Sequence, residues 1–373
     1  MKDIYNKLTK VEALPLILKE LYEARGYEKY IMGEFVPYEI YMENKNFLRD
    51  EGIITFTGAN GKLMALKPDV TMSVVKNITD NTITKKIYYY ENVFRMSKSI
   101  NQYEEIGQIG VEFIGGEDLY SSAEVIELAC KSLESISNKY ILSINDMGFM
   151  SGLIRELNFD EEAEYKLLKI LKSKSQTELK GFCKKYGHND RCFDYLAKIV
   201  KLEGPFNEVL EDAKGLCLND EMTIALDELN ELYEALISID LGGNIKLDLS
   251  IVNDLDYYNG IIFKGYVDGI PAAVLSGGRY DNLMRRLNKK QAAVGFAIYL
   301  SHLDRIMKTD KKYDAEAVLF YNKASTADVI GAVNKLSQKH ESVRAEKEDY
   351  GHIKACYKYV LVDGEIKEAE DNA

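Results

Sequence analysis

The stretch KKIYYYENVFRMSKSINQYEEIGQIGVEFIG, residues 85–115, shows best how the first half of the chain folds. Residues 85–95 and 106–115 are rich in β-branched and aromatic side chains, which favour β-strands. The polar run between them, residues 96–105, has the composition of a loop. We therefore predict two antiparallel strands joined by a long connecting loop.

The second of these strands carries polar side chains and glycine at alternate positions. Gln108, Gly110 and Glu112 are two residues apart, so they lie on one face of the strand. Glutamine and glutamate beside glycine are typical of a polar pocket in which the backbone approaches a ligand. A solvated outer face of the sheet explains the same pattern equally well, so this strand alone does not decide between the two.

The segments on either side predict the strands and helices that complete an α+β domain. Upstream we predict a helix at 10–26, an alternating, strand-like segment at 27–41, a hairpin at 52–69 and a short helix at 70–79. Downstream we predict a helix at 120–137, strands at 139–146, 245–252, 257–269 and 270–283, and a closing helix at 292–307. This order favours an antiparallel sheet with helices packed on it.

Two further regions differ from this sheet in their pattern. Residues from about 151 to 239 repeat Leu, Lys and Glu at helical spacing, which predicts a helical insertion. Residues 311–373 alternate strand, helix and strand patterns, which predicts a small C-terminal α/β unit. We therefore expect a main domain at 1–310 that contains the insertion, and a second domain at 311–373.

Composition and charge argue against several classes of function. A formal net charge of −12 does not favour a nucleic-acid-binding surface over the chain as a whole. The five Cys form no CxxC pair and the four His have no metal-ligand spacing, so we expect no metal site and free thiols in a cytoplasmic protein. No glycine-rich nucleotide motif follows a strand, so we expect no cofactor. The N-terminal apolar run is too short and too mixed for a signal peptide or a membrane span.

Three other short stretches place polar or aromatic groups where a ligand could bind. LKPDVT holds Asp69 and Thr71 at a helix start, where Asp69 alternatively serves as a helix cap. LDYYNG holds Tyr257 and Tyr258, whose rings suit the walls around a planar group, although a solvated strand end is the simpler interpretation. SGGRYDNL holds Tyr280 after a diglycine, a pattern that also fits an ordinary turn.

Six motifs taken in this order are far more specific than any one of them. They are LKPDVT, YYYENVFR, GQIGVEFIG, LDYYNG, SGGRYDNL and AVGFAI, which span residues of about 65 to 300. The chain resembles the catalytic domain of the class II aminoacyl-tRNA synthetases. It is most similar to the histidyl-tRNA synthetases and to their paralogues, the regulatory subunits of ATP phosphoribosyltransferase. The resemblance implies the antiparallel catalytic sheet of that class, with the helical insertion where the family carries one.

The same resemblance implies a binding site for histidine on this sheet. Asp69, Thr71 and Gln108 correspond to groups that contact the amino group of the ligand. Glu112 corresponds to the contact with the imidazole ring. The resemblance assigns further members to this pocket, and they are Arg95, Tyr257, Tyr258 and Tyr280, of which Tyr258 and Tyr280 close around the ring.

The parts that hold ATP in the synthetases depart from the family pattern. Arg95 corresponds to a phosphate-binding arginine and is kept, but the later arginine positions fall within residues 102–105, which include two glutamates. Carboxylates repel a triphosphate, whereas the chemistry needs cations there. His302 replaces the arginine of the third motif, and Asn253 replaces the arginine that activates histidine. These departures imply that adenylation has been lost.

The resemblance therefore implies a regulatory subunit of the short-form ATP phosphoribosyltransferase, without aminoacylation activity of its own. Its expected partners are the catalytic subunit, a second copy of itself within a hetero-oligomer, and L-histidine as a feedback inhibitor, with no tRNA and no membrane. Residues 311–373 hold ten Lys or Arg against twelve Asp or Glu, which also argues against tRNA binding. The alternatives are a divergent histidyl-tRNA synthetase and an orphan paralogue that binds another amino acid.

Overall fold

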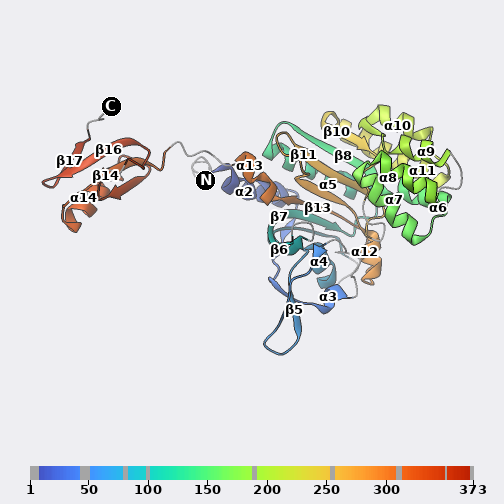
Figure 1. Ribbon diagram of the computed structural model, residues 1–373, viewed down its shortest axis with the longest axis horizontal. Helices are drawn as coiled ribbons and strands as arrows, with labels where there is room; N and C mark the ends of the chain where they lie inside the picture. Colours follow the sequence, from blue (N-terminus) through green and yellow to red (C-terminus); the bar gives the residue numbers. More distant parts are fainter. Residues whose placement is uncertain are drawn as a thin grey trace. The chain divides into compact units, whose positions relative to one another are not determined.

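A computed structural model of the chain describes residues 8–42, 51–78, 83–97, 101–186, 191–252, 257–307, 313–348 and 351–369. The chain forms two compact units, residues 1–307 and 308–373, and each is described here by itself. Figure 1 shows the ribbon coloured along the sequence. The first unit contains the large sheet and all the residues that the sequence assigns to the histidine pocket.

The large sheet of the first unit is almost entirely antiparallel. In order across the sheet, its strands are β1 (Glu28–Lys29), β6 (Lys85–Ser97), β7 (Gln102–Ile114), β13 (Ala293–Tyr299), β12 (Leu275–Arg279), β11 (Ile261–Val267), β8 (Tyr140–Asp146), β10 (Ile245–Asp248) and β9 (Glu203–Pro205), with β3 (Glu51–Gly52) paired to β6. Only the pairs β1–β6 and β8–β10 are parallel among the described strands of this sheet. The predicted α+β class with an antiparallel sheet is confirmed.

Helices and a smaller sheet surround the large sheet. The helices are α2 (Lys10–Glu23), α3 (Glu39–Met42), α4 (Thr71–Asn77), α5 (Leu119–Ile136), α6 (Met147–Leu157), α7 (Glu161–Ser173), α8 (Gln176–Tyr186), α9 (Arg191–Ile199), α10 (Phe206–Lys214), α11 (Asp220–Ile237), the 3-10 helix η2 (Gly242–Asn244), α12 (Asp281–Arg286) and α13 (Leu300–Met307). The smaller sheet has the order β2 (Phe35–Pro37), β5 (Leu63–Leu66) and β4 (Thr55–Thr57). Helices α6 to α11 gather at one end of the large sheet (Figure 1) and contain most of the residues predicted to be helical from 151 to 239.

The two faces of the large sheet pack against different elements. Side chains alternate along a strand, so Tyr88 and Tyr89 of β6 point to opposite faces. Tyr88 belongs to the larger hydrophobic cluster, which the sheet shares with α2 and α5. Tyr89 belongs to a second cluster with α4 and α12. Glu112 pairs with Ile87 across the sheet, so it lies on the same face as Tyr89 and beneath α4.

The predicted strand pair at 85–115 is confirmed, but its connection is shorter than predicted. β6 and β7 are each 13 residues long, and Arg95 pairs with Glu104 inside the run predicted to be a loop. The long loop at 96–105 is therefore a wrong prediction. Backbone pairing does not depend on side-chain polarity, so strands can continue through polar residues whose side chains are in water. The polar residues at both ends of this run therefore lengthen the hairpin. The register places Glu104 directly opposite Arg95.

The predicted helix at 292–307 is wrong in its first half. Residues 293–299 form β13, which lies between β7 and β12, and only the remainder forms a helix, α13. A strand in the middle of a sheet is covered on both faces, so its sequence is apolar without alternation. Periodicity alone does not distinguish such a run from a buried helix.

Most of the other predicted elements of the first unit are confirmed. The hairpin at 52–69 forms β4 and β5, and the helix at 70–79 forms α4. The segment 27–41 contains the short strands β1 and β2 followed by α3, instead of one strand-like run. Within the described ranges, no helix combines the length and the apolar composition that crossing a bilayer requires.

The second unit is a small α/β fold with a core of its own. It contains β14 (Ala315–Phe320), α14 (Thr326–Leu336), β15 (Val343–Glu346), β16 (Ala355–Val362) and β17 (Glu365–Glu368). Its sheet has the order β15-β14-β16-β17, with β14 parallel to both neighbours. Leu319 of β14 packs with Ala332 and Leu336 of α14, so the helix covers one face of the sheet.

Candidate functional site

Glu112 on β7 is the centre of the candidate site. The residue is only 1% exposed. The Thr71 hydroxyl donates a hydrogen bond to Oε1 at 2.6 Å, and the Tyr280 hydroxyl donates one to Oε2 at 2.6 Å. Burial raises the pKa of Glu112 to about 8, although both hydrogen bonds favour the ionised form and oppose this rise. The site therefore holds a carboxyl group that titrates close to neutral pH.

The N-terminal end of α4 brings Asp69 and Thr71 to this carboxyl group. Asp69 Oδ1 accepts a hydrogen bond from the backbone N–H of Met72 at 2.7 Å, so the capping role considered for Asp69 is confirmed. Burial raises the pKa of Asp69, and the Arg95 guanidinium partly opposes the rise. The cap uses Oδ1, so it is compatible with a ligand contact through the other oxygen.

Arg95 on β6 supports the loop that carries Asp69. Its Nε donates to the carbonyl oxygen of Pro68 at 2.7 Å, directly before Asp69 in the chain. Glu104 pairs with Arg95 from the neighbouring strand, so an acidic residue is its cross-strand neighbour. Arg95 thus lies at the edge of the site, where it positions the loop.

Three tyrosines form the aromatic part of the site. The ring centroids of Tyr257 and Tyr258 are 4.3 Å apart, and those of Tyr257 and Tyr280 are 5.9 Å apart. The Tyr258 ring lies against the diglycine of β12, because a Cβ built on Gly278 would be 2.9 Å from Tyr258 Cδ1. The missing side chain at Gly278 therefore leaves room for the ring of Tyr258.

Gln108 lies on the same face of β7, two residues before Glu112. It is 4% exposed and is paired across the sheet with Glu91 on β6 and Tyr299 on β13. This face of β7 is therefore buried, so the interpretation as a solvated outer face is wrong, and a ligand pocket at this face stays a prediction. The structure thus brings seven of the eight predicted residues around one carboxyl group or onto its strand face, and Arg95 adjoins them. Their contact with histidine stays a prediction.

Sequence reasoning missed three residues that shape this site. Gly295 pairs with Glu112, and a Cβ built on it would lie 1.8 Å from Glu112 Oε2. Tyr89 is 1% exposed, and Tyr299 lies near it and Tyr258. Gly295 and Tyr299 were missed because their segment was predicted as a helix. Tyr89 is two residues before Glu91, so both lie on the face of β6 that adjoins Glu112. This alternation could have identified Tyr89 from the sequence.

Some of the residues discussed from the sequence lie outside the described ranges. Asn253, the residue predicted to replace the activating arginine, is among them. Among the described residues, no group of three or more His, Cys, Asp or Glu is arranged to hold a metal ion.

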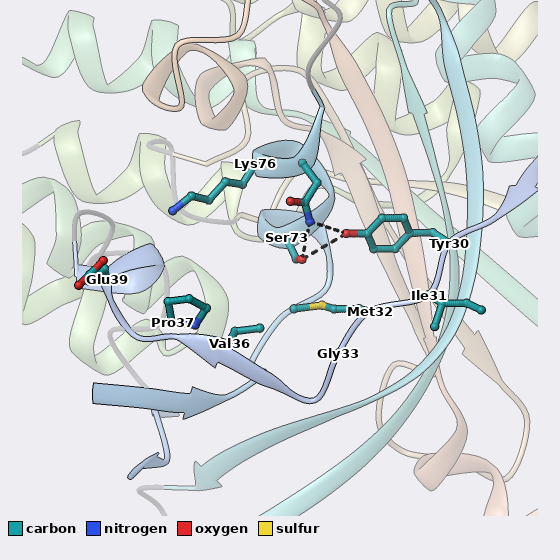
Figure 2. A pocket seen from close by; sticks show the side chains of 10 residues that line it. Tyr30, Ile31, Met32, Gly33, Val36, Pro37, Glu39, Ser73 and Lys76 are labelled. Carbon is teal, nitrogen blue, oxygen red and sulfur yellow. Dashed lines mark hydrogen bonds between the residues drawn. The ribbon is translucent and has the colours of Figure 1, made fainter. Parts of the chain in front are cut away.

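A separate cavity lies on the other side of α4 (Figure 2). It has a volume of about 410 Å³ and includes Tyr30, Met32, Ser73 and Lys76 in its lining. The Tyr30 hydroxyl and Ser73 Oγ are 3.3 Å apart and hydrogen-bonded. None of the eight predicted residues lines this cavity, so it is distinct from the site around Glu112.

Comparison with known proteins identifies the family. The sequence profile described as histidyl-tRNA synthetase matches residues 5–303. An ATP phosphoribosyltransferase regulatory subunit from Clostridium botulinum (strain Langeland) is 30% identical, with 86% of this chain and 79% of the relative covered. The chain belongs to the ATP phosphoribosyltransferase regulatory subunits, within the histidyl-tRNA synthetase family. The family predicted from the six motifs is therefore confirmed.

Solved structures agree with the fold of this family. A crystal structure described as an ATP phosphoribosyltransferase regulatory subunit/histidyl-tRNA synthetase from Bacillus halodurans has a TM-score of 0.76 at 23% identity, covering 92% of this chain and 90% of that one. A chain of the ATP phosphoribosyl transferase (HisG:HisZ) complex from Thermotoga maritima has a TM-score of 0.61 at 18% identity. The match covers 77% of this chain and 96% of that chain. At these identities the likeness shows the fold alone.

The raised pKa of Glu112 predicts a pH-dependent stability. The native state keeps the proton up to about pH 8, whereas the ordinary pKa of 4.5 applies once the chain unfolds. The native state therefore binds more protons between these values, and the free energy of unfolding falls as pH rises by up to about 1.4 kcal/mol per pH unit. In Glu112→Gln this contribution is absent, so its urea unfolding depends less on pH than that of the unmodified chain.

Glu105→Gln is the matched control, because Glu105 is exposed on the same strand and on the opposite face. It should keep the pH dependence of the unmodified chain. Parallel stability profiles for the unmodified chain and Glu112→Gln would show that Glu112 is ionised in the native state throughout.

The clearance at Gly295 gives a second prediction. Gly295→Ala places a Cβ against Glu112 and the Val111 carbonyl oxygen, so we expect the free energy of unfolding to fall by at least about 3 kcal/mol. Gly181→Ala in α8 is the control, since nothing lies within 4 Å of its Cβ position, and it should be neutral or stabilising. Equal stability of the two variants would contradict this packing.

Proposed function

We propose that the chain is a non-catalytic regulatory subunit that activates the catalytic subunit of ATP phosphoribosyltransferase and binds L-histidine as the feedback inhibitor of the first step of histidine biosynthesis. The observation that carries this proposal is the buried carboxyl group of Glu112, placed among hydroxyl groups and tyrosine rings. Family membership supplies the regulatory role, and this pocket supplies the chemistry for the amino acid.

The imidazole ring is the ligand group that suits Glu112 best. At neutral pH the free carboxyl group holds a proton, because its pKa is about 8. An imidazole with an ordinary pKa near 6.5 can share that proton, so the buried pair remains neutral overall or forms a compensated ion pair. The hydroxyl groups of Thr71 and Tyr280 can both donate and accept, so they adjust to either arrangement.

The other end of an amino acid fits the groups at the start of α4. A bound ammonium group would offset the desolvated charge of Asp69, whose pKa is raised by burial. Gln108 offers a buried amide on the same sheet face. Each charge-assisted hydrogen bond contributes about 1.5–3 kcal/mol, so a few of them support micromolar binding after the cost of association.

The surroundings of Arg95 support the absence of aminoacylation. Arg95 faces Glu104 across the hairpin, and its Nε is used by the Pro68 carbonyl oxygen. His302 stands at the position of the third-motif arginine, and its Nδ1 lies 3.0 Å from the carbonyl oxygen of Ala273. A triphosphate needs several converging cations, and this chain has a glutamate and a histidine at these positions.

We propose that the catalytic subunit and a second copy of this chain are its partners in the cytoplasm, and that tRNA is not. The family name and the complex from Thermotoga maritima support the first partnership. Histidine bound near Glu112 acts through a coupling free energy, typically about 1–3 kcal/mol, that links this site to the active site of the catalytic subunit. The negative balance of residues 311–373 disfavours tRNA.

The first test is inhibition of the complex reconstituted with a short-form catalytic subunit. Glu112→Ala removes the predicted imidazole contact, so we expect the half-inhibitory concentration of histidine to rise about tenfold or more. Loss of uninhibited activity should be smaller than this loss of inhibition. Glu105→Ala is the control, and histidine should inhibit its complex as strongly as it inhibits the complex with the unmodified chain. If Glu112→Ala lowers activity as much as inhibition, Glu112 has only a structural role.

The second test is histidine-dependent exchange between ATP and pyrophosphate, which reports adenylation. We expect background exchange for this chain, because the cations that hold the triphosphate are replaced. A histidyl-tRNA synthetase assayed in parallel is the positive control. Exchange well above background would establish that the chain is an amino-acid-activating enzyme.

A further inference from the structure

A buried ion pair lies directly before the residue that carries the acidic group of α4. Lys67 is 1% exposed, and its ammonium group pairs with the carboxylate of Glu91 on β6. The side chain of Glu91 is largely buried as well, since it is 10% exposed. Neither residue belongs to the predicted histidine pocket, so the proposed function leaves this pair without a role.

Both members of the pair also hold the backbone of Met32. Glu91 Oε1 accepts a hydrogen bond from the Met32 N–H at 3.1 Å, and Lys67 Nζ donates one to the Met32 carbonyl oxygen at 3.5 Å. The two charged groups therefore contact each other and both polar groups of one peptide residue. The arrangement has a direction, because exchanging the two side chains would place acceptor against acceptor and donor against donor at Met32.

The backbone of Lys67 connects the same two segments as its side chain. Its N–H donates to the Glu34 carbonyl oxygen at 2.9 Å, and its carbonyl oxygen accepts from the Phe94 N–H at 2.9 Å. Glu34 lies directly before β2, and Phe94 lies in β6. Main chain and side chain together therefore fix Lys67 between residues 32–34 and β6.

This constraint extends along the chain to the start of α4. Pro68 follows Lys67, and its fixed φ angle limits how far the next residue can move. Asp69 comes next and caps α4 with one carboxylate oxygen. The ion pair is only two residues away, so it restricts where the second carboxylate oxygen of Asp69 lies.

The ion pair also adjoins the opposite side of the candidate site. Glu91 pairs with Gln108 across β6 and β7, so their side chains are neighbours on one sheet face. The pair thus adjoins Asp69 through the chain and Gln108 through the sheet. These are the two groups that the proposed function assigns to the ammonium end of the ligand.

Stability alone does not explain a buried ion pair at this place. Desolvation of two charges offsets much of their attraction, and an apolar pair of similar shape is often equally stable. The ion pair differs from an apolar pair because its charge-assisted hydrogen bonds fix distances and directions. The charge of Lys67 also compensates that of Glu91, which would otherwise compete with Asp69 for a cationic group of the ligand.

We propose that Lys67 and Glu91 are positioning residues that hold Asp69 in place for the ammonium group of the bound amino acid. They act through the loop and do not contact the ligand. This inference rests on the proposed function, since it requires histidine to bind with its ammonium group beside Asp69. It adds that the preference for an α-amino group depends on a pair outside the pocket.

The test compares L-histidine with imidazole propionate, which keeps the imidazole ring and the carboxylate of histidine but lacks the amino group. Calorimetric titration of the full chain gives both affinities, that of the analogue by displacement of histidine. The unmodified chain should prefer histidine about tenfold or more, because only histidine offers Asp69 a charge-assisted contact. In Lys67→Met/Glu91→Gln, histidine should bind about tenfold more weakly and the analogue as before, so most of the preference is lost.

Lys86→Met/Glu124→Gln is the matched control. Lys86 lies on the same strand but on its other face, and its ion pair with Glu124, at 2.8 Å, is also partly buried. This variant should keep the preference for histidine.

The double variant Lys67→Met/Glu91→Gln should fold, because it leaves no charge unpaired and keeps an acceptor for the Met32 N–H. Its melting temperature checks this. If it does not fold, Glu91→Gln alone takes its place, since it keeps an oxygen acceptor for Lys67 and should reduce the preference in the same direction.

Three results would overturn the inference and leave the proposed function intact. They are histidine binding by the variant as tight as that of the unmodified chain, equal weakening of histidine and the analogue, and loss of the preference in the control variant. Histidine binding by the unmodified chain without preference over the analogue would also overturn it. If the unmodified chain does not bind histidine at all, the proposed function itself fails and the inference fails with it.

Discussion

The burial of one carboxyl group, that of Glu112, is the constraint on which the rest of the candidate site depends. A buried acid is costly unless its oxygens are hydrogen-bonded. Four segments distant in the sequence meet this requirement: α4 supplies Thr71, the end of β12 supplies Tyr280, β7 carries the acid, and β13 supplies the glycine that leaves room for it. The order of strands β7, β13 and β12 in the sheet is therefore also what assembles the pocket.

The two halves of the proposed site offer different chemistry. The half around Glu112 keeps an acid, hydroxyl groups and flat rings, which suit a small zwitterion with an aromatic side chain. The half around Arg95 needs converging cations to hold a triphosphate, and here a glutamate faces the arginine across the hairpin. Under the proposed function, this sheet binds an amino acid without the cations that its activation requires.

Sequence patterns predicted the parts of this structure that local chemistry determines. The alternation in β7 placed Gln108 and Glu112 on one face, and the aspartate before α4 indicated where that helix begins. The strand β13 was not predicted, because a strand covered on both faces lacks alternation. Its glycine was missed for the same reason, since its role depends on the neighbouring strand. The length of the hairpin was underestimated because polar side chains on a solvated hairpin resemble those of a loop.

A crystal structure of the chain grown with saturating L-histidine tests the central claim most directly. The account predicts an imidazole nitrogen within hydrogen-bonding distance of Glu112, the ring between Tyr258 and Tyr280, and the ammonium group beside Asp69. Histidine bound at another place, with Thr71 and Tyr280 still hydrogen-bonded to Glu112 as they are without ligand, would contradict it.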